Sequence, residues 1–193
     1  MKFKTLADAR VFFQYYSKLI YIIFVKKIKM KKTTLLLISL LCLNIAAFSQ
    51  IKTLPSVDLK TLEGANFNIQ EINNDSSPII ISFWATWCKP CKKELNNIAE
   101  IYEDWQEKTN VKLIAISIDD SRSMSKVAPY VNASDWDYEV YLDPNGDLKR
   151  AMGVSTVPHT FVLNGAKEIV WDHKGYVDGD EEELYEQIKK ASH

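Results

Sequence analysis

Cysteine is scarce in this sequence. Only Cys42, Cys88 and Cys91 occur among 193 residues, and Cys42 lies in an apolar leader. A single close pair in the body of the chain excludes the disulfide framework that holds many small secreted domains together. A structural zinc site would also lack a second pair of ligands, because only three histidines and no further cysteine accompany the pair. The two body cysteines are therefore candidates for chemistry.

Positive charge is scarce outside the first part of the chain. Residues 1–49 carry 9 Lys and Arg against 1 Asp and Glu, whereas residues 50–193 carry 15 against 24. The acidic body argues against DNA, RNA or an anionic lipid surface as the partner. A basic start in front of an acidic body fits a targeting segment on a soluble domain.

The leader has no apolar run as long as a membrane-spanning helix, which needs about 20 residues. Lysines follow Met30, a short apolar run covers Leu35–Leu43, and the small residues Ala47 and Ser49 precede a cleavage point before Gln50. This is the pattern of a secretory signal peptide. We therefore predict export, with an uncleaved membrane anchor as the alternative interpretation of the same segment.

These features divide the chain into three predicted parts. Residues 1–29 are an N-terminal extension for which the simplest interpretation is that translation starts at Met30; a long basic region ahead of the signal peptide is the alternative. Residues 30–49 form the signal peptide, and residues 50–193 form one domain without an internal repeat. The length of this last part suits a single ordinary domain, which we expect to act as a monomer.

The domain alternates between strand and helix patterns. Continuous β-branched and aromatic runs at 78–84 and 111–118 predict strands buried on both faces. A strand or hairpin is predicted within 50–77, and a further strand at 138–142. Helices are predicted at the segment marked by Leu95, Ile98, Tyr102 and Trp105, at 124–131, and in a short stretch that ends near Gly153. The chain then forms a predicted hairpin of 160–163 and 168–171 about Asn164-Gly165, followed by a closing helix capped by Asp178 or Asp180. This order predicts an α/β fold: a central mixed β-sheet with helices on both faces and a short N-terminal β extension.

The segment Cys88-Lys89-Pro90-Cys91 lies where the strand at 78–84 runs into a predicted helix. The first turn of a helix has free N–H groups and the positive end of the helix dipole, which stabilise a thiolate at Cys88. Lys89 adds a positive charge, and Pro90 suits the first turn because it lacks an N–H. Both sulfurs lie at one helix end, so a redox disulfide is expected. Cys88 is predicted to attack a substrate disulfide, and the more buried Cys91 to resolve the mixed disulfide.

Residues 84–94, WATWCKPCKKE, resemble the active-site segment of the thioredoxin superfamily, above all its exported TlpA/ResA-like branch. The resemblance implies a thioredoxin fold and a thiol-disulfide oxidoreductase that needs no cofactor and no metal. It also implies a cis-proline loop at Val157-Pro158, which faces the cysteines and pairs with the substrate backbone. The substrate-binding residues expected on this basis are Trp87, Lys89, Pro90, Val157 and Pro158.

Glu94 is the candidate for moving protons at this site. It lies three residues after Cys91, one helical turn away. A partly buried carboxylate there would have a raised pKa and could exchange the proton of Cys91. The ResA-like branch has a glutamate at this position that is implicated in proton handling. Ser82 stands where cytoplasmic thioredoxins have a buried acidic residue, which leaves Glu94 as the available carboxylate; an ordinary surface glutamate is the alternative.

The same resemblance implies a place and a direction for the chemistry. It points to a reductant in the periplasm or cell envelope that receives electrons from a membrane thiol donor. The substrates would be exported proteins with disulfides, with apocytochrome c before haem attachment as the class that comes with the branch. Nucleic acid is not expected as a partner.

Three alternative functions stay open. A DsbA-like oxidant differs in its reduction potential, which Lys89-Pro90 does not decide. A peroxiredoxin-type peroxidase is disfavoured, because Ile81 stands seven residues before Cys88, where the motif that members of that group resemble has Pro. A copper-binding thiol chaperone could use the two cysteines with His159, since soft thiolates suit Cu(I).

Overall fold

The computed structural model describes residues 52–192. The predicted extension at 1–29 and the predicted signal peptide at 30–49 lie outside the described residues, and so does Cys42. Within 52–192, no helix combines the length and the apolar character that a membrane crossing requires. The fold and the site are therefore those of the predicted third part of the chain.

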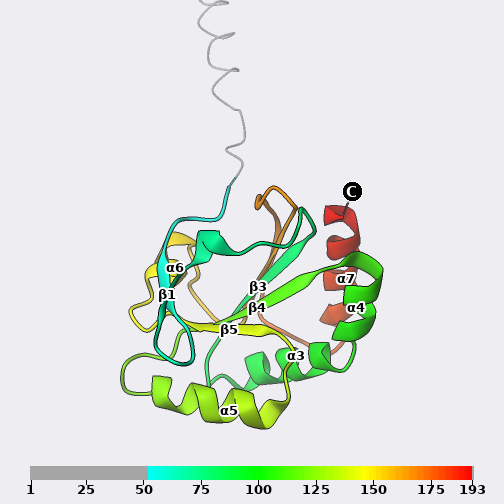
Figure 1. Ribbon diagram of the computed structural model, residues 1–193. Coiled ribbons are helices and arrows are strands. Elements are labelled where there is room, and N and C mark those ends of the chain that lie inside the picture. The colour runs from blue at the N-terminus through cyan, green and yellow to red at the C-terminus, as the bar shows by residue number, and fades with distance from the viewer. Residues whose placement is uncertain (1–51, 193) are drawn as a thin grey trace, which may run out of the picture. The chain divides into compact units, whose positions relative to one another are not determined.

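A mixed sheet runs through the described part of the chain (Figure 1). Its strands are β1 (Asp58–Lys60), β2 (Asn66–Asn68), β3 (Ile79–Trp84), β4 (Lys112–Ser117), β5 (Glu139–Leu142), β6 (His159–Leu163) and β7 (Ile169–Lys174). They lie in the order β2-β1-β5-β4-β3-β6-β7. Strands β3, β4 and β5 are parallel, and the other neighbours are antiparallel. The predicted mixed sheet is confirmed, with the β1–β2 hairpin as its N-terminal β extension.

Helices cover both faces of the sheet, as predicted. They are α3 (Lys89–Ala99), α4 (Tyr102–Thr109), α5 (Val127–Ser134), α6 (Asp147–Ala151) and α7 (Asp180–Ala191), with 3₁₀ turns η1 (Ile69–Glu71) and η2 (Met124–Lys126). On one face, α3, α4, α5 and α7 pack over Ile80 and Trp84 of β3. On the other face, α6 and η1 pack over Ile79, Ile81 and Phe83. Side chains alternate between the faces of a strand, and β3, which is apolar at every position except Ser82, is buried on both sides.

The segment predicted as one helix from Leu95 to Trp105 is two helices. Helix α3 ends at Ala99, and α4 begins at Tyr102. The bend brings the Tyr102 ring onto Tyr138, with 5.3 Å between ring centroids. It also lets the Tyr102 hydroxyl accept the N–H of Leu113 in β4 at 2.8 Å. The apolar spacing of three and four residues continues across the bend, so the sequence pattern could not reveal it.

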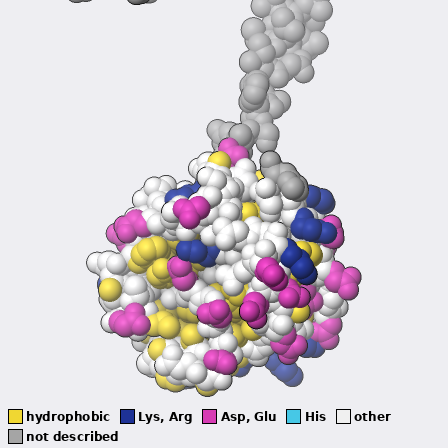
Figure 2. All heavy atoms as spheres, turned by 45° about the vertical axis from the view of Figure 1, so that its right-hand side comes forward, with side chains coloured by type: hydrophobic (Ala, Val, Ile, Leu, Met, Phe, Trp, Pro, Cys, Tyr) yellow, Lys and Arg dark blue, Asp and Glu magenta, His cyan; other side chains and the backbone are white. Residues whose placement is uncertain are grey.

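The closing helix α7 begins at neither predicted cap. Gly179, with φ of +100°, is the N-cap residue. Asp180 instead accepts the N–H of Val177 at 2.8 Å, and Glu181 accepts the N–H of Gly179 at 2.9 Å. The free N–H groups at the turn are thus satisfied by carboxylates inside the first helical turn, where negative charge also suits the helix dipole. Figure 2 shows acidic side chains spread over the side of the molecule on which α4 and α7 lie.

The predicted hairpin of β6 and β7 forms, but its loop differs from a tight Asn-Gly turn. The loop covers residues 164–168, and its left-handed residue is Lys167, with φ of +61°, rather than Gly165. Gly165 is needed for space instead, because a Cβ on it would lie 1.8 Å from the carbonyl oxygen of Ser76. Glycine here permits a close approach of two backbones, which is one of its recurrent uses.

Gly165→Ala is therefore expected to destabilise the protein by about 2 kcal/mol, since one of the two loops must move to accept the methyl group. Urea unfolding of the oxidised protein measures the change. The neighbour Ala166 provides a control, because its side chain is exposed and Ala166→Ser adds one atom at this exposed position. An unchanged unfolding midpoint for Gly165→Ala would show that the approach of Ser76 does not constrain this position.

Candidate active site

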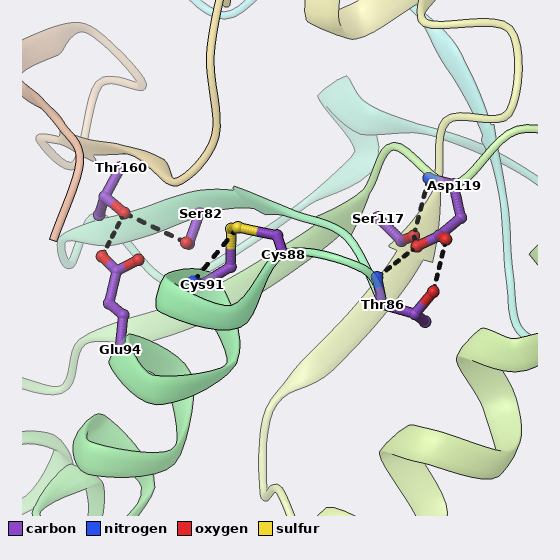
Figure 3. The surroundings of a disulfide bond; sticks show 8 residues. All are labelled: Ser82, Thr86, Cys88, Cys91, Glu94, Ser117, Asp119 and Thr160. Carbon is purple, nitrogen blue, oxygen red and sulfur yellow. Dashed lines mark hydrogen bonds between the residues drawn. A yellow bond between two sulfur atoms is a disulfide. The ribbon is translucent and has the colours of Figure 1, made fainter. Parts of the chain in front are cut away.

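The two body cysteines lie at the start of α3, just after β3 and a short loop (Figure 3). Cys88 is the N-cap residue of α3, and its Sγ accepts the N–H of Cys91 at 3.3 Å. A disulfide joins the two residues, whose Cα atoms are 5.4 Å apart. Cys88 is 5% exposed and Cys91 is fully buried. Of the two cysteines, the one at the helix N-terminus is thus the more exposed.

The aromatic residues around the motif have different surroundings. Trp87 is 65% exposed and stands beside Cys88 on the surface. Trp84, by contrast, is fully buried and packs edge-on against Trp136, with 5.0 Å between ring centroids. Lys89 and Pro90 are exposed in the first turn of α3. The exposed surface next to the disulfide is therefore formed by Trp87, Lys89 and Pro90.

The predicted proline loop lies at the end of the sheet at which the cysteine motif begins. The Val157–Pro158 peptide bond is cis, as the resemblance implied. Strand β6 begins directly after Pro158, and its first residue is paired with Phe83, near the end of β3. Because the cysteine motif follows the end of β3, the antiparallel register brings the loop and the motif together. The Pro158 carbonyl accepts the N–H of Gly175 at 2.9 Å.

Glu94 is buried one turn into α3, at 5% exposure. The Thr160 hydroxyl donates to its Oε1 at 2.6 Å, and the Ser82 hydroxyl lies 3.1 Å from that of Thr160. Its Oε2 has no hydrogen-bond partner among residues 52–192, and Figure 3 draws this oxygen on the side of the disulfide. Burial raises the pKa of Glu94 to about 7, against the lowering effect of the Thr160 hydrogen bond. A carboxyl group that titrates near neutral pH can both take and give a proton in exchange chemistry.

A small cavity adjoins Glu94 between β6, β7 and α7. Its lining includes Thr160, His173, Asp180 and Glu181. The negative charges of Glu181 and Asp180 add to the rise in the pKa of Glu94. The pKa of the buried Glu94 carboxyl group therefore depends on the acidic residues at the start of α7. These residues are far from Glu94 in the sequence, so this interaction could not be predicted from it.

A second polar cluster beside the motif was not predicted. Asp119, which follows β4, is fully buried. Its carboxylate accepts the backbone N–H of Thr86 at 2.8 Å and the Thr86 hydroxyl at 2.7 Å. The Ser117 hydroxyl donates to it at 2.8 Å. The available signal was an acidic residue directly after a buried strand parallel to β3, because parallel neighbouring strands end at the same edge of a sheet.

His159 is a strand residue with a polar partner. Its Nε2 lies 2.8 Å from a carboxylate oxygen of Asp172, and its ring stacks on Phe161, with 4.1 Å between centroids. Burial lowers the pKa of His159, and the carboxylate of Asp172 opposes this. His159 and Phe161 alternate with Thr160 along β6, so the imidazole lies on the face of the sheet opposite to Glu94.

Comparison with known proteins agrees with this arrangement. Residues 52–172 match the model of the AhpC/TSA family. The thiol-disulfide oxidoreductase ResA of Bacillus thuringiensis subsp. konkukian (strain 97-27) is 29% identical over 141 residues, which are 73% of this chain and 78% of that protein. The sporulation thiol-disulfide oxidoreductase A of Bacillus subtilis (strain 168) is 33% identical over 112 residues, which are 58% of this chain and 66% of that protein.

A solved structure extends the likeness to three dimensions. The solution structure of an uncharacterized thioredoxin-like protein from Porphyromonas gingivalis superimposes with a TM-score of 0.65 at 47% sequence identity. The match covers 72% of this chain and 91% of that one. The predicted thioredoxin fold is confirmed by this match together with the order of the strands and helices. The chain therefore belongs to the AhpC/TSA family, among its thioredoxin-fold thiol-disulfide oxidoreductases.

Proposed function

We propose that this protein is an exported reductant that exchanges disulfides with partner proteins through Cys88 and Cys91. The observation that carries the proposal is the disulfide at the N-terminus of α3, one helical turn from the buried carboxyl group of Glu94. The helix terminus favours a thiolate at Cys88. Glu94 supplies a proton-transfer group for the more buried Cys91.

The proposed reaction is two successive thiol-disulfide exchanges. In the reduced protein, the Cys88 thiolate attacks one sulfur of a substrate disulfide, and the other substrate sulfur leaves as a thiolate. Cys91 then gives its proton to Glu94 and attacks Cys88, which breaks the mixed disulfide and frees the second substrate thiolate. The substrate gains two electrons and, after protonation, two hydrogen atoms. The protein is left with the Cys88–Cys91 disulfide, which an electron donor must reduce again.

The surface around the disulfide supports a protein as the substrate. Trp87 exposes a large apolar side chain next to Cys88, and an extended substrate segment would lie beside Val157 and Pro158. Lys89 and Pro90 complete this contact surface. We infer that no deep pocket for a small molecule is required, because the substrate presents its disulfide across an open surface.

The direction and location are proposed from the resemblance of residues 84–94 and from the leader. A signal peptide at 30–49 would export the domain to the periplasm or cell envelope, as a monomer free or tethered to the membrane. There a membrane thiol protein would donate the electrons, and disulfide-bearing exported proteins would accept them. Apocytochrome c is the proposed substrate class, because haem attachment requires its cysteines to be reduced.

The reduction potential of the Cys88–Cys91 pair tests the proposed direction. Tryptophan fluorescence in thiol buffers follows the change from disulfide to dithiol, because Trp87 is adjacent to Cys88 and Trp84 lies four residues before it. We expect one two-electron transition at or below about -250 mV, on the thioredoxin side of the scale. A value near about -120 mV, as for DsbA, would assign an oxidant instead. The absence of any transition would overturn dithiol chemistry at this site.

A further inference from the structure

Asp119 is a fully buried carboxylate to which the proposed chemistry gives no role. Within the part of the chain that the structure describes, its carboxylate has three hydrogen-bond partners, the Thr86 N–H, the Thr86 hydroxyl and the Ser117 hydroxyl, at 2.7–2.8 Å. All three can donate, which is the arrangement that satisfies an ionised carboxylate. Two of the three belong to Thr86, in the loop between β3 and the cysteine motif. Figure 3 shows the Asp119 carboxylate hydrogen-bonded to this loop, on the opposite side of the cysteine motif from Glu94.

The bonds to Thr86 hold the loop that presents the nucleophile. Thr86 is two residues before Cys88, and between them only exposed Trp87 intervenes. The loop is also tied by the N–H of Cys88, which bonds to the Ala85 carbonyl at 3.0 Å. An anchored backbone on both sides of Trp87 fixes where α3 begins and therefore where the Cys88 sulfur lies. Hydrogen bonds to a charged group are the stronger kind, so Asp119 is the principal anchor of the loop.

The same carboxylate places a negative charge close to the nucleophile. Chain geometry keeps the Asp119 oxygens within about 10 Å of Cys88, because they touch Thr86 two residues away. Reduction of the disulfide by two electrons leaves a thiolate at Cys88 and, with one proton, a thiol at Cys91. The oxidised pair carries no charge, so the repulsion between Asp119 and a Cys88 thiolate acts on the reduced form alone. At about 10 Å in a protein interior this corresponds to about tenfold in the reduction equilibrium.

We propose that Asp119 is a positioning residue of the dithiol site, which anchors the Thr86 loop and, through its charge, keeps the reduction potential of the Cys88–Cys91 pair low. The inference rests on the proposed dithiol function and explains part of its reducing direction. It adds a determinant outside the Cys-Lys-Pro-Cys motif. The positive helix terminus favours the Cys88 thiolate, and Asp119 opposes that effect from the other side of the loop.

The test is the equilibrium of each variant with a thiol buffer, read by tryptophan fluorescence. Asp119→Asn is expected to shift the equilibrium about tenfold toward the reduced form, equivalent to about 30 mV. Asp119→Ser removes the same charge with a smaller side chain that can still accept a hydrogen bond from Thr86, and it keeps the test available if the Asn variant does not fold. Both variants are expected to shift in the same direction, because both are neutral.

A matched control is Asp143→Asn, the same substitution at another buried carboxylate. Asp143 is 2% exposed and accepts the N–H groups of Asp147 and Lys149, at 2.7 and 2.8 Å, at the start of α6. This variant is expected to lose stability equally in its oxidised and reduced forms, which leaves its potential unchanged. If the reduction equilibria of both Asp119 variants lay within twofold of the wild-type value, Asp119 would be only a structural residue. That result would overturn this inference and leave the proposed function standing. A wild-type protein without any transition would overturn the proposed function and this inference with it.

Discussion

Cys91→Ser is expected to accumulate as a stable mixed disulfide with its protein substrates. Cys88 at the N-terminus of α3 keeps its thiolate and still attacks a substrate disulfide. Without the Cys91 sulfur, no internal thiol can break the new bond, so most variant molecules should become covalently linked to a partner. Non-reducing gel electrophoresis of exported proteins, followed by identification of the linked chains, measures the trapping and names the substrates.

The matched variant for this experiment is Cys88→Ser. It leaves Cys91, which is fully buried under the first turn of the helix, and a buried thiol reaches a protein disulfide poorly. It should therefore trap far less than Cys91→Ser. Equal trapping by both variants would show that the two sulfurs do not have separate roles. It would contradict the assignment of Cys88 as nucleophile and Cys91 as resolving cysteine.

Glu94→Gln is expected to remove a pH dependence that extends through neutral pH. In the oxidised wild-type protein the pKa of Glu94 is raised by burial from 4.5 to about 7. A carboxyl group with a raised folded-state pKa contributes its full stability below the unfolded pKa and loses it as the pH rises through the folded one. Between about pH 4.5 and 7 the wild-type protein should therefore lose on the order of 3 kcal/mol, as the buried group ionises. The Gln variant should not show this loss.

Exchange kinetics give the second readout for Glu94. Above about pH 7 the ionised carboxylate can take the proton of Cys91, and its removal should slow the resolving step by about 100-fold, a usual size for general-base catalysis. Urea unfolding of the oxidised protein at pH 5 and pH 8 gives the stability, and stopped-flow reduction of a disulfide substrate gives the rate. The control is Glu100→Gln, because Glu100 is an exposed glutamate at the end of α3. If Glu94→Gln kept the wild-type pH profiles, Glu94 would be an ordinary buried side chain without a role in proton transfer.

The sequence by itself determined the local chemistry and the architecture. The Cys-Lys-Pro-Cys spacing, the strand before it and the helix after it are all encoded within residues 78–99, because helix starts and buried strands depend on short-range patterns. The mixed sheet followed from the alternation of strand and helix patterns with a final hairpin. The position of Glu94 one turn from Cys91 followed from the helical repeat alone.

The tertiary structure decided which distant residues meet at the site. Asp119 lies 33 residues from Thr86, and Thr160 lies 66 residues from Glu94, yet each pair is hydrogen-bonded. Such contacts depend on which strands are neighbours and on their register, and periodicity along the chain carries no information about either. The bend between α3 and α4 and the space requirement at Gly165 have the same origin: both are set by packing against segments remote in sequence. The depth of Glu94, and with it the pKa that suits it to proton transfer, is a property of the assembled interior between α3, β6 and α7.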